Sequence, residues 1–132
     1  MKEFVKGMHH IGIPTAHMDD TVAFYEAFGA KVVFEKTDEY EGRPIRVKLM
    51  DLAGTVIECY ERPETFMAAG AMDHIAFEVN DIEAMYRVCK EKGYRLMEEC
   101  RDELGASSYW PEALRWFIVY GPNEEKIEFC KA

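Results

Sequence analysis

An internal repeat constrains the fold of this chain more than any other feature of its sequence. The segment MDHIAFE at residues 72–78 aligns with MHHIGIP at residues 8–14 at an offset of 64 residues, and the helical patterns that follow align without a gap. The ends of the two copies align at an offset of 70 residues, which lays Glu128 on Glu58. Small units that each expose an apolar sheet face are poorly stable alone, so we expect one pseudo-symmetric domain.

Each copy carries the pattern of one helix among four strands. A short apolar strand comes first, and apolar residues spaced three or four apart then predict an amphipathic helix that ends near Gly29 or Gly93. Three strand-like stretches follow in each copy, at residues 31–37, 45–50 and 54–60 and at residues 94–98, 115–120 and 125–130. The longer second copy places its extra residues in an expected loop over residues 99–114.

The predicted fold class is therefore α+β, built from two tandem βαβββ modules. The first module covers about residues 8–60 and the second about residues 72–131, with a linker at residues 61–71. We expect both to lie in a single domain over residues 1–132.

Composition narrows the class of partner. The chain has 132 residues with a formal net charge of -9, which disfavours nucleic acids and anionic membranes because both require clustered Lys and Arg. No window approaches the roughly 20 apolar residues of a membrane span, and residues 1–4 begin no signal-peptide pattern. We expect a cytoplasmic protein whose partners are small molecules and cations rather than nucleic acid or membrane.

Strand alternation places one histidine and one glutamate of each copy on the face away from the helix. These residues are His10 and Glu58 in the first copy and His74 and Glu128 in the second. A lone histidine or glutamate on a strand is usually a solvated surface residue, but the same pair recurs at matching positions. If the sheet curls around that face, the four side chains converge and predict a divalent metal site, with His9 on the opposite face as a structural residue.

Other residues are weaker candidates for substrate contact. Arg46 and Lys48 share one strand face and would bind a substrate carboxylate or phosphate if that face is concave; a solvated rim strand is the alternative. Tyr109, Trp110 and Trp116 lie in or beside the expected loop, where they would form a pocket wall or belong to the core.

Over residues 8 to 131 the sequence resembles the vicinal oxygen chelate superfamily. That group includes glyoxalase I, methylmalonyl-CoA epimerase, extradiol dioxygenases, and fosfomycin and bleomycin resistance proteins. The matching segments are HHIGI, FYEAFGAKVV, TVIECYE, DHIAFEV and YGPNEEKIEF. The resemblance implies mixed sheets that curl around a central metal-binding cavity, with the helices outside. It also implies one divalent ion (Ni, Co, Zn or Mn) per site, held by His10, Glu58, His74 and Glu128.

The resemblance also implies a reaction. Four protein ligands favour the glyoxalase I and epimerase branch, in which proton transfer next to a metal-bound carbonyl proceeds through an enediolate. Glu128 would be the catalytic base and Glu58 a ligand or partner base. Such a lyase or isomerase would act on a small-molecule carbonyl compound, such as a thiol adduct, and would form a homodimer. Pro14 and Arg62 stand where glutathione-using members carry Arg and Asn, which argues against glutathione.

Three functions stay open at this point. The first is a glyoxalase I-type lyase or isomerase. The second is an epimerase of an acyl thioester, which uses the same proton chemistry. The third is a non-catalytic binding or resistance protein that uses the metal to hold its ligand. The site would be built within one chain or across a dimer.

Overall fold

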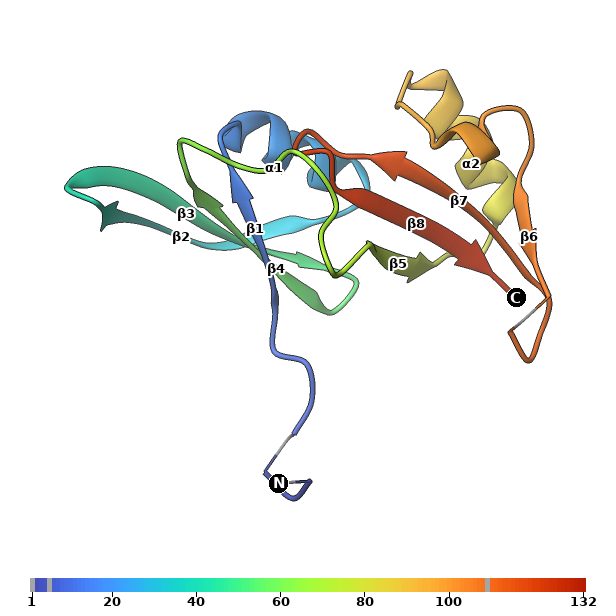
Figure 1. Ribbon diagram of the computed structural model, residues 1–132, viewed down its shortest axis with the longest axis horizontal. Helices are drawn as coiled ribbons and strands as arrows, with labels where there is room; N and C mark the ends of the chain where they lie inside the picture. The colour runs from blue at the N-terminus through green and yellow to red at the C-terminus, as the bar shows by residue number, and fades with distance from the viewer. Residues whose placement is uncertain (1, 5, 109) are drawn as a thin grey trace. The chain divides into compact units, whose positions relative to one another are not determined.

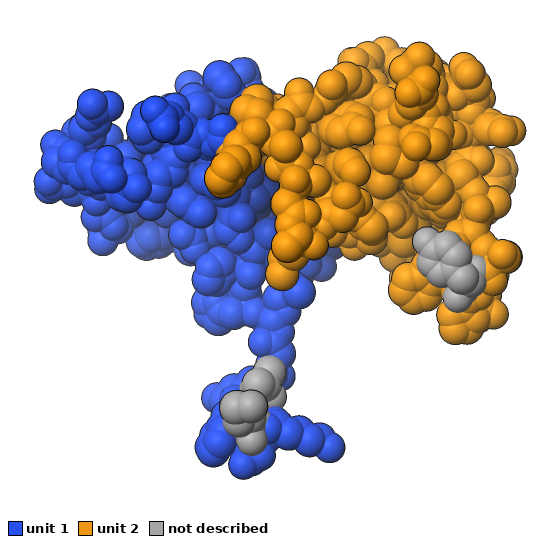
Figure 2. All heavy atoms as spheres, viewed as in Figure 1, with its two compact units in different colours: residues 1–65 blue, residues 66–132 orange. Residues whose placement is uncertain are grey.

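The computed structural model describes residues 2–4, 6–108 and 110–132 and divides the chain into two compact units. Unit 1 is Met1–Thr65 and unit 2 is Phe66–Ala132 (Figure 2). The boundary between them falls inside the predicted linker at residues 61–71. The single domain over residues 1–132 stays a prediction.

Unit 1 is a four-stranded mixed sheet with one helix (Figure 1). Its elements are β1 (Ile11–Thr15), α1 (Met18–Ala27), β2 (Lys31–Tyr40), β3 (Arg43–Leu52) and β4 (Thr55–Glu61). The strand order is β1-β4-β3-β2, with β1 parallel to β4 and the other pairs antiparallel. The first and last strands of the unit are therefore neighbours, which brings residues far apart in sequence together.

Unit 2 repeats this arrangement. Its elements are β5 (His74–Glu78), α2 (Ile82–Glu91), the short 3-10 helix η1 (Glu98–Cys100), β6 (Gly105–Ser107), β7 (Leu114–Tyr120) and β8 (Lys126–Lys131). The strand order β5-β8-β7-β6 has the same parallel pair of first and last strands. The predicted α+β class with two tandem βαβββ modules is confirmed, whereas a cavity shared by the two modules stays a prediction.

Each helix covers one face of its own sheet, and the core of the unit lies between them. In unit 1, Tyr25 of α1 is fully buried, as are Ile57 and Cys59 of β4. In unit 2, α2 packs against β7 and β8, where Phe117 and Ile127 are buried. Because side chains alternate along a strand, burying these residues leaves the residues between them on the opposite face.

Both helices end as the sequence predicts. The last turn of each is followed by a glycine in the left-handed region, Gly29 at φ 101° and Gly93 at φ 77°, where a side chain would be strained. His17 is the residue that precedes the first turn of α1. Each helix has ten residues, and none in the described part of the chain is long and apolar enough to cross a membrane.

The outer edge of the second sheet differs from the prediction. A strand was expected at residues 94–98, but the structure has one bridge there, between Leu96 and Val119. Two backbone hydrogen bonds hold it: Tyr120 N–H donates to Arg95 O, and Met97 N–H donates to Ile118 O. The chain then turns through η1 and returns as β6, inside the stretch expected to be a loop. The extra residues of the second copy thus split the edge strand into two short pieces.

Candidate metal centre

In unit 1, the parallel pairing of β1 and β4 brings a histidine and a glutamate together. Gly12 lies opposite Glu58, and His10 lies just before β1 on the same side. The Nε2 atom of His10 is 2.9 Å from Oε2 of Glu58. The neighbours of Glu58 in β4 point into the core, so its carboxylate lies on the face opposite α1.

Unit 2 places its own pair in the same way. Ala76 lies opposite Glu128, and Nε2 of His74 is 3.1 Å from Oε2 of Glu128. The surroundings differ, because the Glu128 side chain is 12% exposed whereas that of Glu58 is 33% exposed. Burial raises the pKa of Glu128, and the nearby His74 offsets part of that rise. Glu128 is therefore the more buried of the two carboxylates.

The residue before each histidine contacts the other ring nitrogen. In unit 1, His9 Nδ1 lies 2.8 Å from His10 Nδ1. In unit 2, Asp73 Oδ2 lies 2.9 Å from His74 Nδ1, and Lys126 Nζ lies 3.0 Å from Asp73 Oδ1. The hydrogen bond to His74 and then that to Lys126 lower the pKa of Asp73. Holding Nδ1 in this way fixes the ring and leaves Nε2 directed at the glutamate, as is usual for metal-binding histidines.

Sequence reasoning missed these supporting contacts. It treated His9 as a structural residue on the opposite face and did not single out Asp73. The available signal was positional, because residues 9 and 73 are matched by the repeat and each precedes a candidate ligand. The alternation of side chains along a strand does not predict these contacts, because each depends on the side chain of residue 9 or 73 turning toward the histidine that follows it.

The donor atoms fit a divalent metal ion. Each pair offers one imidazole nitrogen and one carboxylate oxygen, and adjacent ligands of an octahedral ion with bonds of about 2.1 Å lie about 3 Å apart. The separations of 2.9 and 3.1 Å match that spacing. Within the described ranges, no three His, Cys, Asp or Glu side chains form a group able to hold a metal. Each unit thus supplies two donors, and the meeting of all four stays a prediction.

The two pairs line cavities of different character. The cavity of unit 1 measures about 380 Å³, and polar residues such as Asp38, Glu39 and Arg62 line it beside His10 and Glu58. The cavity of unit 2 measures about 560 Å³ and is mainly apolar around its ion-pairing residues. Its lining includes His74, Glu128, Met97, Trp110, Leu114, Trp116 and Ile118.

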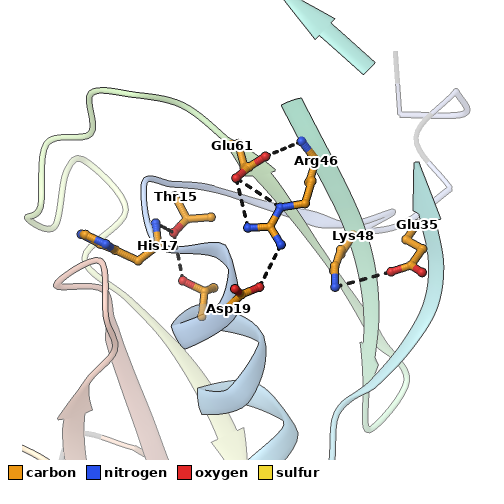
Figure 3. A network of polar contacts seen from close by, with 8 residues as sticks. Thr15, His17, Asp19, Glu35, Arg46, Lys48 and Glu61 are labelled. Atoms are coloured by element: carbon orange, nitrogen blue, oxygen red, sulfur yellow. Dashed lines mark hydrogen bonds and ion pairs between the residues drawn. The ribbon is translucent and has the colours of Figure 1, made fainter. Parts of the chain in front are cut away.

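Arg46 and Lys48 lie on the opposite face of β3 from the candidate ligands. Leu49 of β3 pairs with Glu58 and shares its face, so the residues on either side of Leu49 point toward the α1 side. Figure 3 shows the Arg46 guanidinium between Asp19 of α1, at 2.9 Å, and Glu61, at 3.3 Å. Lys48 Nζ lies 3.4 Å from Glu35 in the same view. Their position does not favour a substrate contact beside His10 and Glu58.

The sequence from residue 7 to residue 129 matches the family model of the Glyoxalase/Bleomycin resistance protein/Dioxygenase superfamily. The chain belongs to this superfamily. The matched region contains both His–Glu pairs, and the resemblance inferred from the sequence is confirmed. No curated protein sequence is significantly similar to the chain.

Solved structures of this superfamily share the fold. The glyoxalase family protein from Enterococcus faecalis has a TM-score of 0.75 at 18% identity, over 97% of this chain and 99% of that one. The fosfomycin resistance protein FosX from Listeria monocytogenes, crystallised with Mn(II) and sulfate, has a TM-score of 0.74 at 18% identity, over 97% and 93%. At this identity the likeness establishes the fold alone.

The aromatic residues expected at a pocket wall divide into two cases. Trp110 and Trp116 line the cavity that contains His74 and Glu128. Tyr109 lies outside the described residues. The position of Trp110 is compatible with a substrate contact, which stays a prediction for this member of the superfamily.

Proposed function

We propose that this protein is a divalent-metal-dependent lyase or isomerase of glyoxalase I type, which transfers a proton next to the carbonyl group of a small molecule. The observation that carries the proposal is the duplicated His–Glu pair, with Nε2–Oε2 separations of 2.9 and 3.1 Å on matching strands. Membership of a superfamily whose description includes glyoxalases supports it.

The proposed ligands are His10, Glu58, His74 and Glu128, and the proposed metal is one Ni, Co, Zn or Mn ion per site. When bound, such an ion polarises a carbonyl oxygen and so acidifies the adjacent C–H bond. The donor set of two nitrogens and two oxygens suits all four metals. Asp73 and His9 support the set, because they hold the histidine rings from the other side.

Glu128 is the proposed base, and Glu58 the proposed ligand or partner base. A carboxylate removes a proton from carbon more effectively when its pKa is raised toward the working pH. Burial raises the pKa of Glu128 in a cavity with apolar walls, which supports this division of roles. For Glu58, one third of the side chain is exposed, and its cavity is lined by charged groups.

The proposed substrate is a small α-hydroxycarbonyl compound or a thiol adduct, and the proposed assembly is a homodimer. A cavity of about 560 Å³ lies within the range of small-molecule sites. Pro14 and Arg62 continue to argue against glutathione as the thiol, and Arg62 is held between the rings of Tyr40 and Tyr60, at 3.7 and 4.8 Å.

The test starts with metal content and solvent exchange. Untagged protein is analysed for bound metal, and methylglyoxal mixed with different thiols is incubated with it in deuterated water. We expect one divalent ion per site, deuterium in the product next to the carbonyl, and loss of both turnover and exchange after chelation. Metal binding without exchange into any bound carbonyl compound would favour a non-catalytic binding protein instead.

Two histidine variants, one at a proposed ligand and one away from it, provide a matched comparison. His74→Ala is expected to lower metal affinity, because it removes one of four proposed donors. His17→Ala is expected to leave metal affinity unchanged, since His17 lies at the start of α1 and makes no capping hydrogen bond there with its side chain. Equal metal affinity in both variants would contradict the proposed ligand set.

A further inference from the structure

The face of unit 2 that carries the His–Glu pair has a tryptophan where the matching face of unit 1 has a valine. Trp116 lies opposite Cys130 in the register of β7 and β8, and Val47 lies opposite Tyr60 in the register of β3 and β4. The repeat therefore matches Trp116 with Val47. With Met97, Leu114 and Ile118, Trp116 forms an apolar wall next to His74 and Glu128.

The indole of Trp116 lies close to the backbone of the neighbouring strand β6. Trp116 lies opposite Gly105 in the register of β6 and β7. A Cβ atom added to Gly105 would lie only 2.3 Å from Cε2 of the indole. Glycine is therefore required for this close approach. The ring is fixed by the backbone before any ligand arrives, and a preorganised aromatic surface binds with little loss of conformational entropy.

Ser107, at the end of β6, contributes an unused polar atom to the same cavity. Its Oγ atom is buried and has no hydrogen-bond partner among the described residues. A buried hydroxyl without a partner is unfavourable, because it has lost its bonds to water, and such groups usually bond a ligand or an ordered water. The apolar wall thus ends in a hydroxyl able to bond a polar substrate atom.

We propose that the substrate of this site carries an aromatic group, which packs against Trp116 and Trp110 while its vicinal oxygen atoms lie at His74 and Glu128. The inference rests on the proposed function and names its substrate class: a carbonyl compound with an aryl substituent, which the site binds in preference to one with a small alkyl group. Two lysines line the cavity: Lys126 is engaged by Asp73, and Lys131 is exposed. The larger part of the lining is therefore apolar.

The test compares two 2-oxo acids that differ only in the group beside the carbonyl. Phenylglyoxylate carries a phenyl ring and pyruvate a methyl group. Both tryptophans of the chain line this cavity, so intrinsic fluorescence reports binding without turnover. We expect phenylglyoxylate to bind about ten- to a hundredfold more tightly, the gain for burying one aromatic ring. Equal affinities would overturn the inference.

Variants of Trp116 test whether the apolar wall causes the preference for phenylglyoxylate over pyruvate. Trp116→Val installs the unit 1 residue and is expected to reduce the preference for the phenyl compound about fivefold or more. Val47→Ala, at the matching position of unit 1, is expected to leave the preference intact. Trp116→Phe retains a ring and is expected to keep most of the preference, which separates lost stacking from lost folding. A full preference in folded Trp116→Val protein would also overturn the inference.

Measuring the same pair of acids with and without added Mn²⁺ keeps this inference distinct from the proposed function. The ring does not contact the metal ligands, so we expect the preference ratio to persist in metal-free protein while both affinities fall. Loss of metal binding and proton exchange with a persisting preference would refute the proposed function alone. Metal binding and proton exchange with no preference would refute the substrate class alone.

Discussion

The two units share a topology and a His–Glu pair, yet they surround that pair differently. Glu58 is one third exposed among charged neighbours, whereas Glu128 is 12% exposed beside tryptophan, leucine and isoleucine side chains. A repeat can therefore retain the positions of its donor atoms while its two halves acquire different chemistry. In the proposed function, unit 1 would hold an ion in a polar setting, and unit 2 would hold a base and an apolar ligand.

The edges of the two sheets show where this difference arises. In unit 1 the edge strand β2 runs without interruption from Lys31 to Tyr40. In unit 2 the same edge is divided between the bridge at Leu96 and the short strand β6. The end of β6 brings Ser107 to the cavity, and the residues after it bring Trp110. The extra residues thus modify the wall of the site without disturbing the two strands that carry the ligands.

One further contact is duplicated and was missed from the sequence. In each unit, an arginine on the third strand (β3 or β7) forms an ion pair with an acidic residue in the first turn of the helix. Arg46 Nη1 lies 2.9 Å from Asp19 Oδ1, and Arg115 Nη1 lies 2.5 Å from Glu83 Oε1. The contact ties the helix to the sheet, and Arg46 has a second carboxylate partner in Glu61.

The largest expected difference between the units concerns catalysis. Glu128→Gln is expected to lower the rate of proton exchange by about 10²–10⁴-fold, because it removes the proposed general base. Glu58→Gln is expected to lower metal affinity more than it lowers the exchange rate of metal-saturated protein. Exchange rates and metal affinities of both variants check this, and a reversed pattern would assign the base to unit 1.

The next largest effect concerns Asp73 and His9, the residues that contact Nδ1 of the candidate histidine ligands. Asp73→Ala is expected to weaken metal binding about 10–100-fold, because a carboxylate that bonds the other ring nitrogen orients a ligating histidine and makes it more basic. His9→Ala is expected to weaken it less, since a neutral imidazole is a poorer acceptor than a carboxylate. Competition with a chelating dye measures both, and an unchanged affinity in Asp73→Ala would exclude this supporting role.

A third difference lies in the helix cores, where the repeat matches Tyr25 with Cys89. Burial raises the pKa of the Cys89 thiol from 9.0 to about 11. The unfolded chain therefore releases this proton at lower pH than the folded protein, so stability falls as the pH rises from about 9 to about 11. The slope contributed is at most about 1.4 kcal/mol per pH unit.

Chemical denaturation of the wild type and of Cys89→Ala across that pH range measures the contribution. We expect a shallower pH dependence in the variant, and native Cys89 should react slowly with thiol reagents at neutral pH because it is 1% exposed. Identical pH dependence in the two proteins would show that this thiol does not contribute.

The smallest expected effect concerns the arginine contacts. Arg46→Met is expected to lower the free energy of unfolding by about 1 kcal/mol, because Arg46 joins two carboxylates across three elements. Arg115→Met is expected to cost about 0.3–0.5 kcal/mol, as for a single exposed ion pair. Urea denaturation at low and high salt compares them, and a larger loss in Arg115→Met would contradict the comparison.

The sequence by itself determined the repeat, the order of helices and strands apart from the edge strand of unit 2, and the two His–Glu pairs. These follow from periodicity and from the alternation of side chains along a strand, which are local properties. The positions of Gly29 and Gly93 were predictable for the same reason, since a helix end is set by the residues next to it.

The tertiary structure decided the rest. Alternation shows that Arg46 and Lys48 share a face, but which face it is depends on the register between β3 and β4, a pairing of residues far apart in the chain. The split edge of unit 2, the burial of Glu128 and the fixing of Trp116 against Gly105 likewise depend on distant segments. Hydrogen-bond register and packing are non-local, so no pattern within a single segment encodes them.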